Sequence, residues 1–202
     1  MIEYALNHPE KLWKALLEHL EMLAVVMIIS IILAAILTIA AMSSNTVSKI
    51  MVYCFSVIYS IPSPALFALL IPVTGIGPMT AMIVLIAYNQ YVLLRNFMAG
   101  LHEVDPSIVE AAAGIGLSRM QVLFQVRLPL STKALFTGVR LAVVSTIGMA
   151  TIAALINAGG LGSILLDGLR TMNVYKILWG SLLSAGLAIG ANLLLIQIEK
   201  RI

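Results

Sequence analysis

The sequence predicts an all-α integral membrane protein with about five transmembrane helices. Hydrophobic residues make up 61% of the chain and charged residues only 10%, whereas an ordinary soluble domain has roughly 25% charged residues. The mean hydropathy is +1.05. Five apolar stretches are long enough to cross the hydrocarbon core of a bilayer, which takes ~20 helical residues. The length of 202 residues is therefore better explained by five spans and their loops than by soluble domains.

The first expected element is an amphipathic segment over residues 1–21. Leu12, Leu16 and Leu20 recur at intervals of four residues, and charged residues occupy the opposite face of the helix. The basic stretch that opens a cleaved signal peptide is missing, because four glutamates stand against two lysines here. We therefore expect a lead-in helix that lies on the membrane surface and is retained in front of the first span.

The predicted transmembrane domain covers residues 22–198 and is followed by a tail at 199–202. Pro62 and Pro64 interrupt the second span and predict a kink or a break, because each proline removes a backbone hydrogen bond. Two prolines and two glycines at 72–78 indicate a turn, and a sixth, short span near this turn stays open. The five expected spans are about 22–41, 51–71, 78–94, 135–156 and 177–198.

Lysine and arginine predict the orientation of the chain, because cytoplasmic loops carry an excess of these residues. If the loop between the third and fourth spans is cytoplasmic, eight of the twelve lysines and arginines lie inside and four lie outside. This distribution favours an N-terminus outside the cell and a C-terminus in the cytoplasm. It also accounts for most of the net charge of +3, which is not a nucleic-acid signature.

The longest segment that cannot sit in a bilayer is the 105–129 loop, between the third and fourth spans. Asp105 is a favourable N-cap, and Pro106 suits the first helical position, where a missing N–H costs nothing. A helix should run from there through an alanine-rich stretch. Gly114 and Gly116 should end this helix, since glycine accepts the left-handed conformation found at helix ends.

A second short helix is expected in the same loop. Ser118 is followed three residues later by Gln121, which is the pattern of a capping box. Leu128-Pro129 should end this helix, because the residue before a proline is pushed out of the α region. The 105–129 loop is therefore predicted to form two short helices that meet at a bend and are small enough for another protein to close around.

The residues of this loop also follow the order of a known family pattern. A Glu-Ala-Ala triplet is followed by a glycine after three residues, by an apolar β-branched residue after nine more, and by Leu-Pro one residue later. This order resembles the EAA loop of bacterial ABC importer permeases (E-A-A-x3-G-x9-I-x-L-P), with valine in place of the usual isoleucine. The matching positions are Glu110, Ala111, Ala112, Gly116, Val126, Leu128 and Pro129.

A second string, after the fourth span, adds to the resemblance. Residues 157–162 read Asn-Ala-Gly-Gly-Leu-Gly and are similar to the A-G-G-L-G string of permeases of the osmoprotectant and methionine importer type. The glycines permit close backbone packing or a sharp turn. Among such permeases, the sequence most resembles those of glycine betaine, carnitine and choline importers.

The resemblance implies the fold of a MetI-like type I importer permease in the bacterial cell membrane. It implies that the 105–129 loop forms a coupling helix in a groove of a cytoplasmic ATP-binding cassette subunit. ATP and Mg²⁺ would be used by that partner, with no cofactor in this chain. The other implied partners are a second permease copy or a related permease and an extracellular solute-binding protein. The expected cargo is a quaternary-amine osmolyte.

The charged residues agree with an energy source outside this chain. All nine acidic residues fall outside the predicted spans or at their extreme ends, whereas a proton-coupled carrier generally needs an ionisable group inside the membrane. The chain has no G-x-x-x-x-G-K-[ST] motif for nucleotide binding, and we expect it not to be an enzyme. Two alternatives stay open: a permease for methionine or another amino acid, and an ion-coupled carrier or membrane scaffold protein.

Candidate residues for the solute pathway follow from the chemistry of the expected cargo. Aromatic faces can hold a quaternary ammonium group. The tyrosines concerned are Tyr53, Tyr59, Tyr88 and Tyr91. Asn157 is a further candidate and, like Asn89 and Gln90, is expected at a span end with local hydrogen bonds. The acidic and histidine residues at 102–105 lack the spacing of metal ligands, so no metal site is predicted.

Overall fold

The structure is a computed structural model that describes residues 2–42 and 44–201. Within these residues every regular element is helical, as the predicted all-α fold requires. The elements are α1 (Ile2–Asn7), α2 (Pro9–Ala41), α3 (Asn45–Ser60), α4 (Ser63–Thr74), α5 (Pro78–His102), α6 (Pro106–Gly114), α7 (Arg119–Val122), a π-helical turn (Leu123–Arg127), α8 (Leu128–Leu130), α9 (Thr132–Ile152), a 3-10 turn (Ala153–Ile156), α10 (Leu161–Arg170) and α11 (Val174–Glu199).

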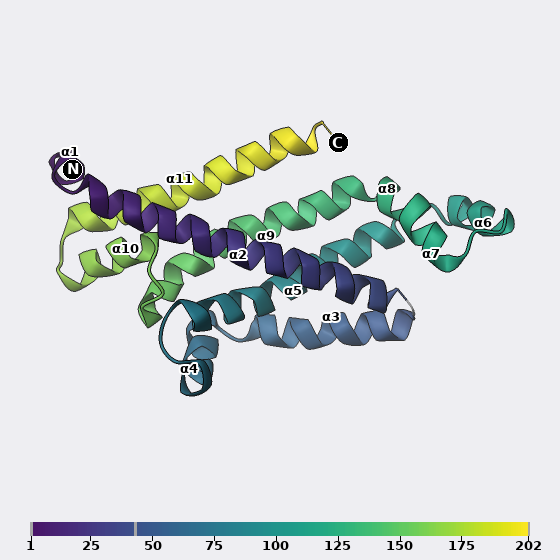
Figure 1. Ribbon diagram of the computed structural model, residues 1–202, viewed down its shortest axis with the longest axis horizontal. Coiled ribbons are helices and arrows are strands. Elements are labelled where there is room, and N and C mark those ends of the chain that lie inside the picture. Colours follow the sequence, from purple (N-terminus) through teal and green to yellow (C-terminus); the bar gives the residue numbers. More distant parts are fainter. Residues whose placement is uncertain (1, 43, 202) are drawn as a thin grey trace.

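The long helices α2, α3, α5, α9 and α11 run along the long axis of the molecule (Figure 1). α5 lies at the centre, in contact with α2, α3, α4 and α9. Its buried side chains include Val84, Leu85 and Leu93. α11 lies at the edge against α9 and α10, and Gly180 is its one buried residue in the described part of the chain. The bundle is therefore built around α5, and α11 leaves a large apolar face exposed.

The two ends of the bundle carry different parts of the chain. The 105–129 loop, with α6, α7 and α8, projects beyond one end of the long helices, while α4 and α10 lie toward the other end (Figure 1). The N-terminal helix α1 lies at the end that holds α10, and α11 runs back from there in the direction of the loop. The N-terminus and the 105–129 loop therefore lie at opposite ends of the bundle.

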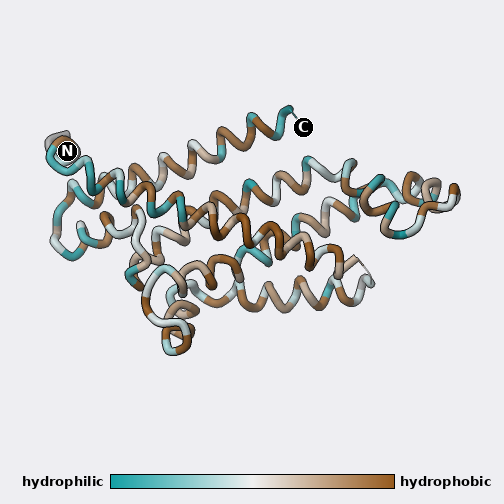
Figure 2. The backbone as a smooth tube through the Cα atoms, viewed as in Figure 1, coloured by the Kyte–Doolittle hydropathy of each residue, from teal (hydrophilic) through white to brown (hydrophobic). Residues whose placement is uncertain are grey.

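Three helical segments are long and apolar enough to cross a membrane by length and composition, namely α2, Thr132–Ile156 and α11. α3 and α4 meet the same criteria as a bent pair. α5, which corresponds to the remaining predicted span, has 25 residues and extends over about 37 Å, but it carries more polar residues. Figure 2 shows hydrophobic residues along the long helices and hydrophilic residues toward their ends.

Residues 9–21 of the segment predicted as a surface helix form one continuous helix with the first predicted span, while the residues ahead of them include the separate short helix α1. α2 runs from Pro9 to Ala41 because no glycine or further proline interrupts it. Ala15 and His19, in its first half, are buried, and α2 is in contact with α10. The lead-in segment is therefore part of the bundle, and the expectation of a separate surface helix is wrong.

The predicted break in the second span is confirmed. α3 ends at Ser60, α4 begins at Ser63, and the chain bends by 95° between them. Ile61, ahead of Pro62, has an extended backbone (φ −73°, ψ 130°). The Tyr88 hydroxyl donates a hydrogen bond to the Ile61 carbonyl. A backbone group freed by the break is therefore satisfied within the protein, as a membrane environment demands.

A buried polar cluster joins α2, α5 and α9 at the centre of the bundle. The Asn89 amide donates to the Ser30 hydroxyl (3.3 Å), and the Asn89 carbonyl oxygen accepts from the Thr146 hydroxyl (3.0 Å). The Gln90 amide donates to the Ser30 carbonyl (3.3 Å). The expectation that Asn89 and Gln90 lie at a span end is wrong, because α5 continues to His102 and places both residues near its middle, where they are buried.

Candidate functional site: the 105–129 loop and the opposite end of the bundle

The first half of the 105–129 loop has the predicted helix. The Asp105 carboxylate caps α6 by accepting a hydrogen bond from the Ser107 N–H (2.9 Å), and Pro106 opens the helix. Hydrogen bonds from the Ser107 backbone and side chain hold the pKa of the Asp105 carboxyl below its ordinary value. α6 ends at Gly114, and Gly116 follows with a φ of +93°. The predicted N-cap and glycine bend are therefore confirmed.

The second half of the loop begins as predicted. The Ser118 hydroxyl accepts from the Gln121 N–H (3.4 Å), and the Gln121 side chain accepts from the Ser118 N–H (2.8 Å). These two reciprocal bonds form the capping box that the sequence indicates. Two backbone N–H groups at the start of α7, which have no partner within the helix, are thus paired by neighbouring side chains. The local sequence alone therefore specifies this bend.

The predicted end of the second helix at Leu128-Pro129 is wrong. Leu128 keeps helical angles (φ −60°, ψ −49°) and donates its N–H to the Leu123 carbonyl, closing a π-helical turn. This wider turn accommodates Pro129, whose ring would clash with the carbonyl four residues earlier in a regular α-helix. The helical path ends only at Ser131 (φ −94°, ψ 0°), so the loop runs into α9 with little interruption.

The loop is fastened to the ends of α5 and α9. The buried Ser131 hydroxyl donates to the Gly100 carbonyl (2.7 Å), and the Arg127 guanidinium donates to the Leu101 carbonyl (2.6 Å). A Cβ at Gly100 would lie 2.6 Å from the Ala134 Cβ, so the end of α5 and the start of α9 are in very close contact. A displacement of the loop must therefore move α5 and α9 with it.

The predicted coupling residues differ in their exposure. Glu110, Ala111 and Gly116 are exposed on the outer side of the loop. Ala112, in contrast, is only 7% exposed and packs inside the loop. The remaining predicted positions are Val126, which is half-buried, and Leu128 and Pro129, which are exposed. The loop therefore exposes Glu110 and Ala111 and uses Ala112 for its own packing.

The structure brings together three of the four tyrosines. The Tyr59 ring meets Tyr88 edge-on, with centroids 5.5 Å apart, and lies 4.9 Å from Tyr91. The Arg95 guanidinium donates to the Tyr91 hydroxyl (3.0 Å). Tyr88 is buried and Tyr59 is exposed. Tyr53, six residues earlier on α3, is 70% exposed. Tyr59, Tyr88 and Tyr91 therefore form an aromatic cluster beside the break between α3 and α4.

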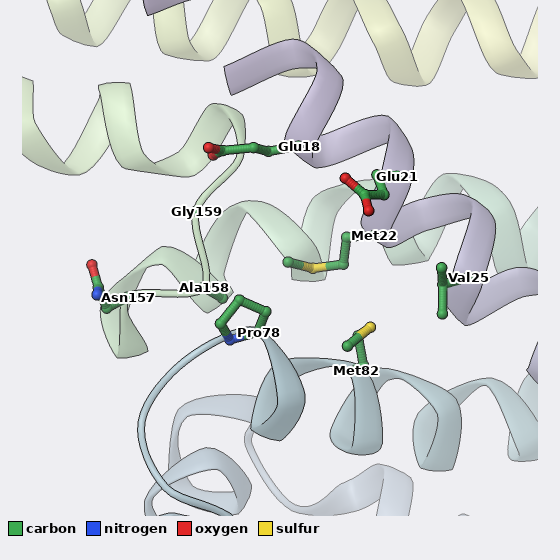
Figure 3. Close-up of a pocket in the computed structure, with 9 residues that line it drawn as sticks. All are labelled: Glu18, Glu21, Met22, Val25, Pro78, Met82, Asn157, Ala158 and Gly159. Atoms are coloured by element: carbon green, nitrogen blue, oxygen red, sulfur yellow. The ribbon is translucent and has the colours of Figure 1, made fainter. Parts of the chain in front are cut away.

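Asn157 lies at a pocket at the end of the bundle opposite to the loop (Figure 3). The pocket has a volume of about 450 Å³, and the described residues that line it include none of the tyrosines. Glu18 and Glu21 contribute carboxylates, and Met22 and Met82 contribute thioethers. The predicted pathway residues therefore fall into two groups, an aromatic cluster and an acidic pocket. The sequence does not indicate that Glu18 and Glu21 line a pocket, because their spacing of three residues is also typical of a solvent-exposed helix face.

The glycine string beside this pocket allows the 157–162 segment to lie in close contact with α2. Gly159 and Gly160 have φ angles of +81° and +71°, and the Gly160 N–H donates to the Glu18 carboxylate (3.0 Å). A Cβ at Gly159 would lie 2.8 Å from the same carboxylate. The glycines therefore let the 157–162 segment turn sharply and pack directly on α2.

Comparison with known proteins agrees with this architecture. Residues 27–202 match the family described as the binding-protein-dependent transport system inner membrane component. The chain belongs to this family. It is therefore an inner-membrane transport component, in agreement with the predicted family, and ATP hydrolysis in such systems resides in a separate subunit.

The similar proteins are transport permeases. The chain is 41% identical over 128 residues to the ergothioneine transport permease/ergothioneine binding protein of Helicobacter pylori, in a match that covers 63% of this chain and 23% of that protein. It is 33% identical to the carnitine transport permease protein of Listeria monocytogenes, over 79% of this chain and 73% of that protein. It is 32% identical to the osmoprotectant import permease protein of Salmonella typhimurium, over 98% of this chain and 94% of that protein.

The fold is shared with a solved transporter. A chain in an inward-facing structure of the MetNI methionine ABC transporter superposes with a TM-score of 0.84 and 21% identity. The superposition covers 96% of this chain and 98% of that chain. The predicted MetI-like fold is therefore confirmed.

Proposed function

We propose that this chain forms half of the solute pathway of an ATP-driven importer for a small trimethylammonium compound. The observation that carries the proposal is the exposed Glu110-Ala111 face on a loop that is fastened to α5 and α9, in a chain of the binding-protein-dependent transport family. A partner that grips this face can move the two central helices, because the loop has little freedom of its own.

The proposed mechanism needs an ATPase, since this chain has no nucleotide-binding motif. Two ATP-binding cassette subunits bind the 105–129 loops of two permease copies on the cytoplasmic side. Their closure on ATP displaces the loops, and the bonds from Arg127 and Ser131 to the end of α5 transmit the displacement into the bundle. The N-terminus and the pocket at Asn157 then face outward, where a solute-binding protein delivers the cargo.

The proposed cargo follows from the chemistry shared by the solutes of similar proteins. Ergothioneine and carnitine, named for two of these proteins, both carry a trimethylammonium group. Aromatic faces and carboxylates suit such a cation, and the structure holds both, at Tyr59 and in the pocket at Glu18 and Glu21. We propose that the cation passes these two groups. Ergothioneine is a specific candidate because the identity to its permease reaches 41% over 128 residues.

Uptake by intact cells tests the choice of cargo. A strain without this chain should lose accumulation of labelled carnitine or ergothioneine and keep accumulation of methionine. The comparison is informative because methionine is named for the transporter that shares the fold. Loss of methionine uptake alone would overturn the proposed cargo and leave the proposed class of transporter standing.

A change at Gly116 tests the coupling role of the loop. Its φ of +93° strains any residue with a Cβ, so Gly116→Asp should distort the bend while membrane insertion and ATP hydrolysis continue and transport stops. Gly114→Asp is the matched control, because a Cβ added at Gly114 would meet no heavy atom within 4 Å and would not be strained by a positive φ. Normal transport by the Gly116→Asp variant would count against the coupling role.

A further inference from the structure

A groove lies between the end of α2 and the 105–129 loop. It has a volume of about 520 Å³, and its walls include Ile39 and Met42 of α2, Val109 and Ala113 of α6, and Leu123 of the π-helical turn. These side chains are apolar, so water in the groove has few hydrogen-bond partners on the walls. The groove lies where the apolar length of α2 ends, which places it at the boundary between hydrocarbon and polar surroundings.

Two arginines give this groove a positive rim. Arg119 and Arg127 both line it, and the described lining residues include no acidic side chain. Arg127 uses one donor on the Leu101 carbonyl, which leaves the rest of its planar fork for another acceptor. Arg119 is exposed. The charge of the rim is therefore complementary to an anion that carries several acceptor oxygens, such as a phosphate group.

The groove continues an apolar stripe on α2. Ile28, Ile32 and Ile36 are each more than half exposed, and with Ile39 they recur at intervals of four, four and three residues, which puts them on one face of the helix. Because Ile39 also lines the groove, the stripe leads from the middle of α2 to the two arginines. A hydrocarbon chain lying on the stripe would therefore place its polar end at the rim.

A narrower slot of about 150 Å³ adjoins the groove and shares Ile39 and Leu123 with it. Thr38, which lines this slot, is 5% exposed. Its hydroxyl has no hydrogen-bond partner among the described residues. A buried hydroxyl without a partner is costly, and an ester carbonyl below a phosphate group is an acceptor of the right kind at this depth.

We propose that this groove binds an anionic phospholipid, with its phosphate between Arg119 and Arg127 and an acyl chain along the isoleucine stripe. A lipid fits better than a protein partner, because Val109 and Ala113 line the groove, whereas Glu110 and Ala111, which carry the proposed contact with the ATPase, do not line it. Basic pockets between transmembrane helices on the cytoplasmic side are known lipid-binding features. The bound lipid would tie the end of α2 to the 105–129 loop.

Native mass spectrometry of the purified full chain tests this proposal. The protein is released from mixed micelles that hold phosphatidylglycerol and phosphatidylcholine with identical acyl chains, and the retained lipids are counted. We expect phosphatidylglycerol to be retained in preference to phosphatidylcholine. Arg119→Gln should weaken that retention roughly fivefold, and Arg119→Gln with Arg127→Gln about 30-fold, from the ordinary contribution of one basic residue near an anionic lipid.

Lys133→Gln is the matched control, because Lys133 is an exposed cation at the same end of the bundle that does not line the groove. Its retention of phosphatidylglycerol should equal that of the unchanged chain. Equal retention of both lipids, or equal losses in the Lys133 and Arg119 variants, would overturn the proposal. If the double variant loses helix content, the lipid retention of the Arg119→Gln single variant decides the outcome, because Arg119 is exposed. Loss of a co-purified ATPase with unchanged lipid retention would assign the groove to a protein instead.

Discussion

At the residue scale, Gly162 has less room for a side chain than any other glycine of the chain. A Cβ on Gly162 would collide with the backbone oxygen of Thr151 and lie 2.9 Å from the Ala154 Cβ. The backbone of α9 cannot yield as a flexible side chain would. The A-G-G-L-G string is therefore a packing device between α10 and the end of α9, in addition to the turn that Gly159 and Gly160 make over Glu18.

Gly162→Ala should destabilise the protein by about 3 kcal/mol, because overpacking against fixed backbone costs about that much. The measurement is the thermal unfolding midpoint in detergent. Gly148→Ala serves as the control, since its Cβ would meet nothing within 4 Å and alanine is the better helix former. An unfolding midpoint for Gly162→Ala equal to that of Gly148→Ala would contradict the described contact.

Asp105 should make the start of α6 sensitive to acid. Its pKa is lowered in the folded loop by hydrogen bonds from Ser107. The contribution of Asp105 to the stability of α6 is therefore complete above the ordinary carboxyl pKa of about 4. That contribution is lost as the pH falls through the lower pKa of the folded state. Hydrogen exchange at 106–111, corrected for intrinsic rates, should reveal the loosening at low pH. Asp105→Asn keeps a neutral cap and should flatten this pH dependence; an unchanged dependence would exclude Asp105 as its source.

At the element scale, the 105–129 loop shows what local sequence can and cannot specify. The Asp105 cap and the capping box at Ser118 and Gln121 involve neighbours within three residues, so the residue types alone predict them. The π-helical turn is not predicted because the proline rule describes a regular α-helix, whereas here the chain widens one turn and continues through Pro129. The contacts with the end of α5 also cannot be predicted from local sequence, because they join residues that are 26 and 31 positions apart in the chain.

Two neighbouring alanines in α6 should respond differently to enlargement. Ala111 is exposed, so Ala111→Leu should reduce co-purification of the ATPase and leave the loop folded, because the added side chain meets only the partner. Ala112 is 7% exposed, so Ala112→Leu should disturb the loop itself. Pull-down of the ATPase with hydrogen exchange of the loop separates the two effects. Normal ATPase recovery with Ala111→Leu would argue against docking on this face.

At the scale of the whole molecule, composition predicts the fold class well, while the arrangement of the helices requires the structure. The apolar runs identify α2, α9 and α11 in the sequence. They do not reveal that α5 is the central helix, because its buried Asn89 and Gln90 resemble residues of a polar span end. Only the packing of α2, α5 and α9 shows that Ser30 and Thr146 pair both ends of the Asn89 amide and that the Gln90 NH2 group donates to the Ser30 carbonyl. The acidic pocket at Glu18 cannot be predicted from the sequence either, because packing brings its lining residues together from α2, α5 and the 157–159 segment.

An ATPase that acts through the 105–129 loop should drive solute movement by this protein. The direct measurement is uptake of labelled carnitine or ergothioneine by proteoliposomes that contain this chain, its ATPase and its solute-binding protein. We predict uptake with ATP and none with an ion gradient alone. Uptake that persists on an ion gradient without ATP would contradict the account.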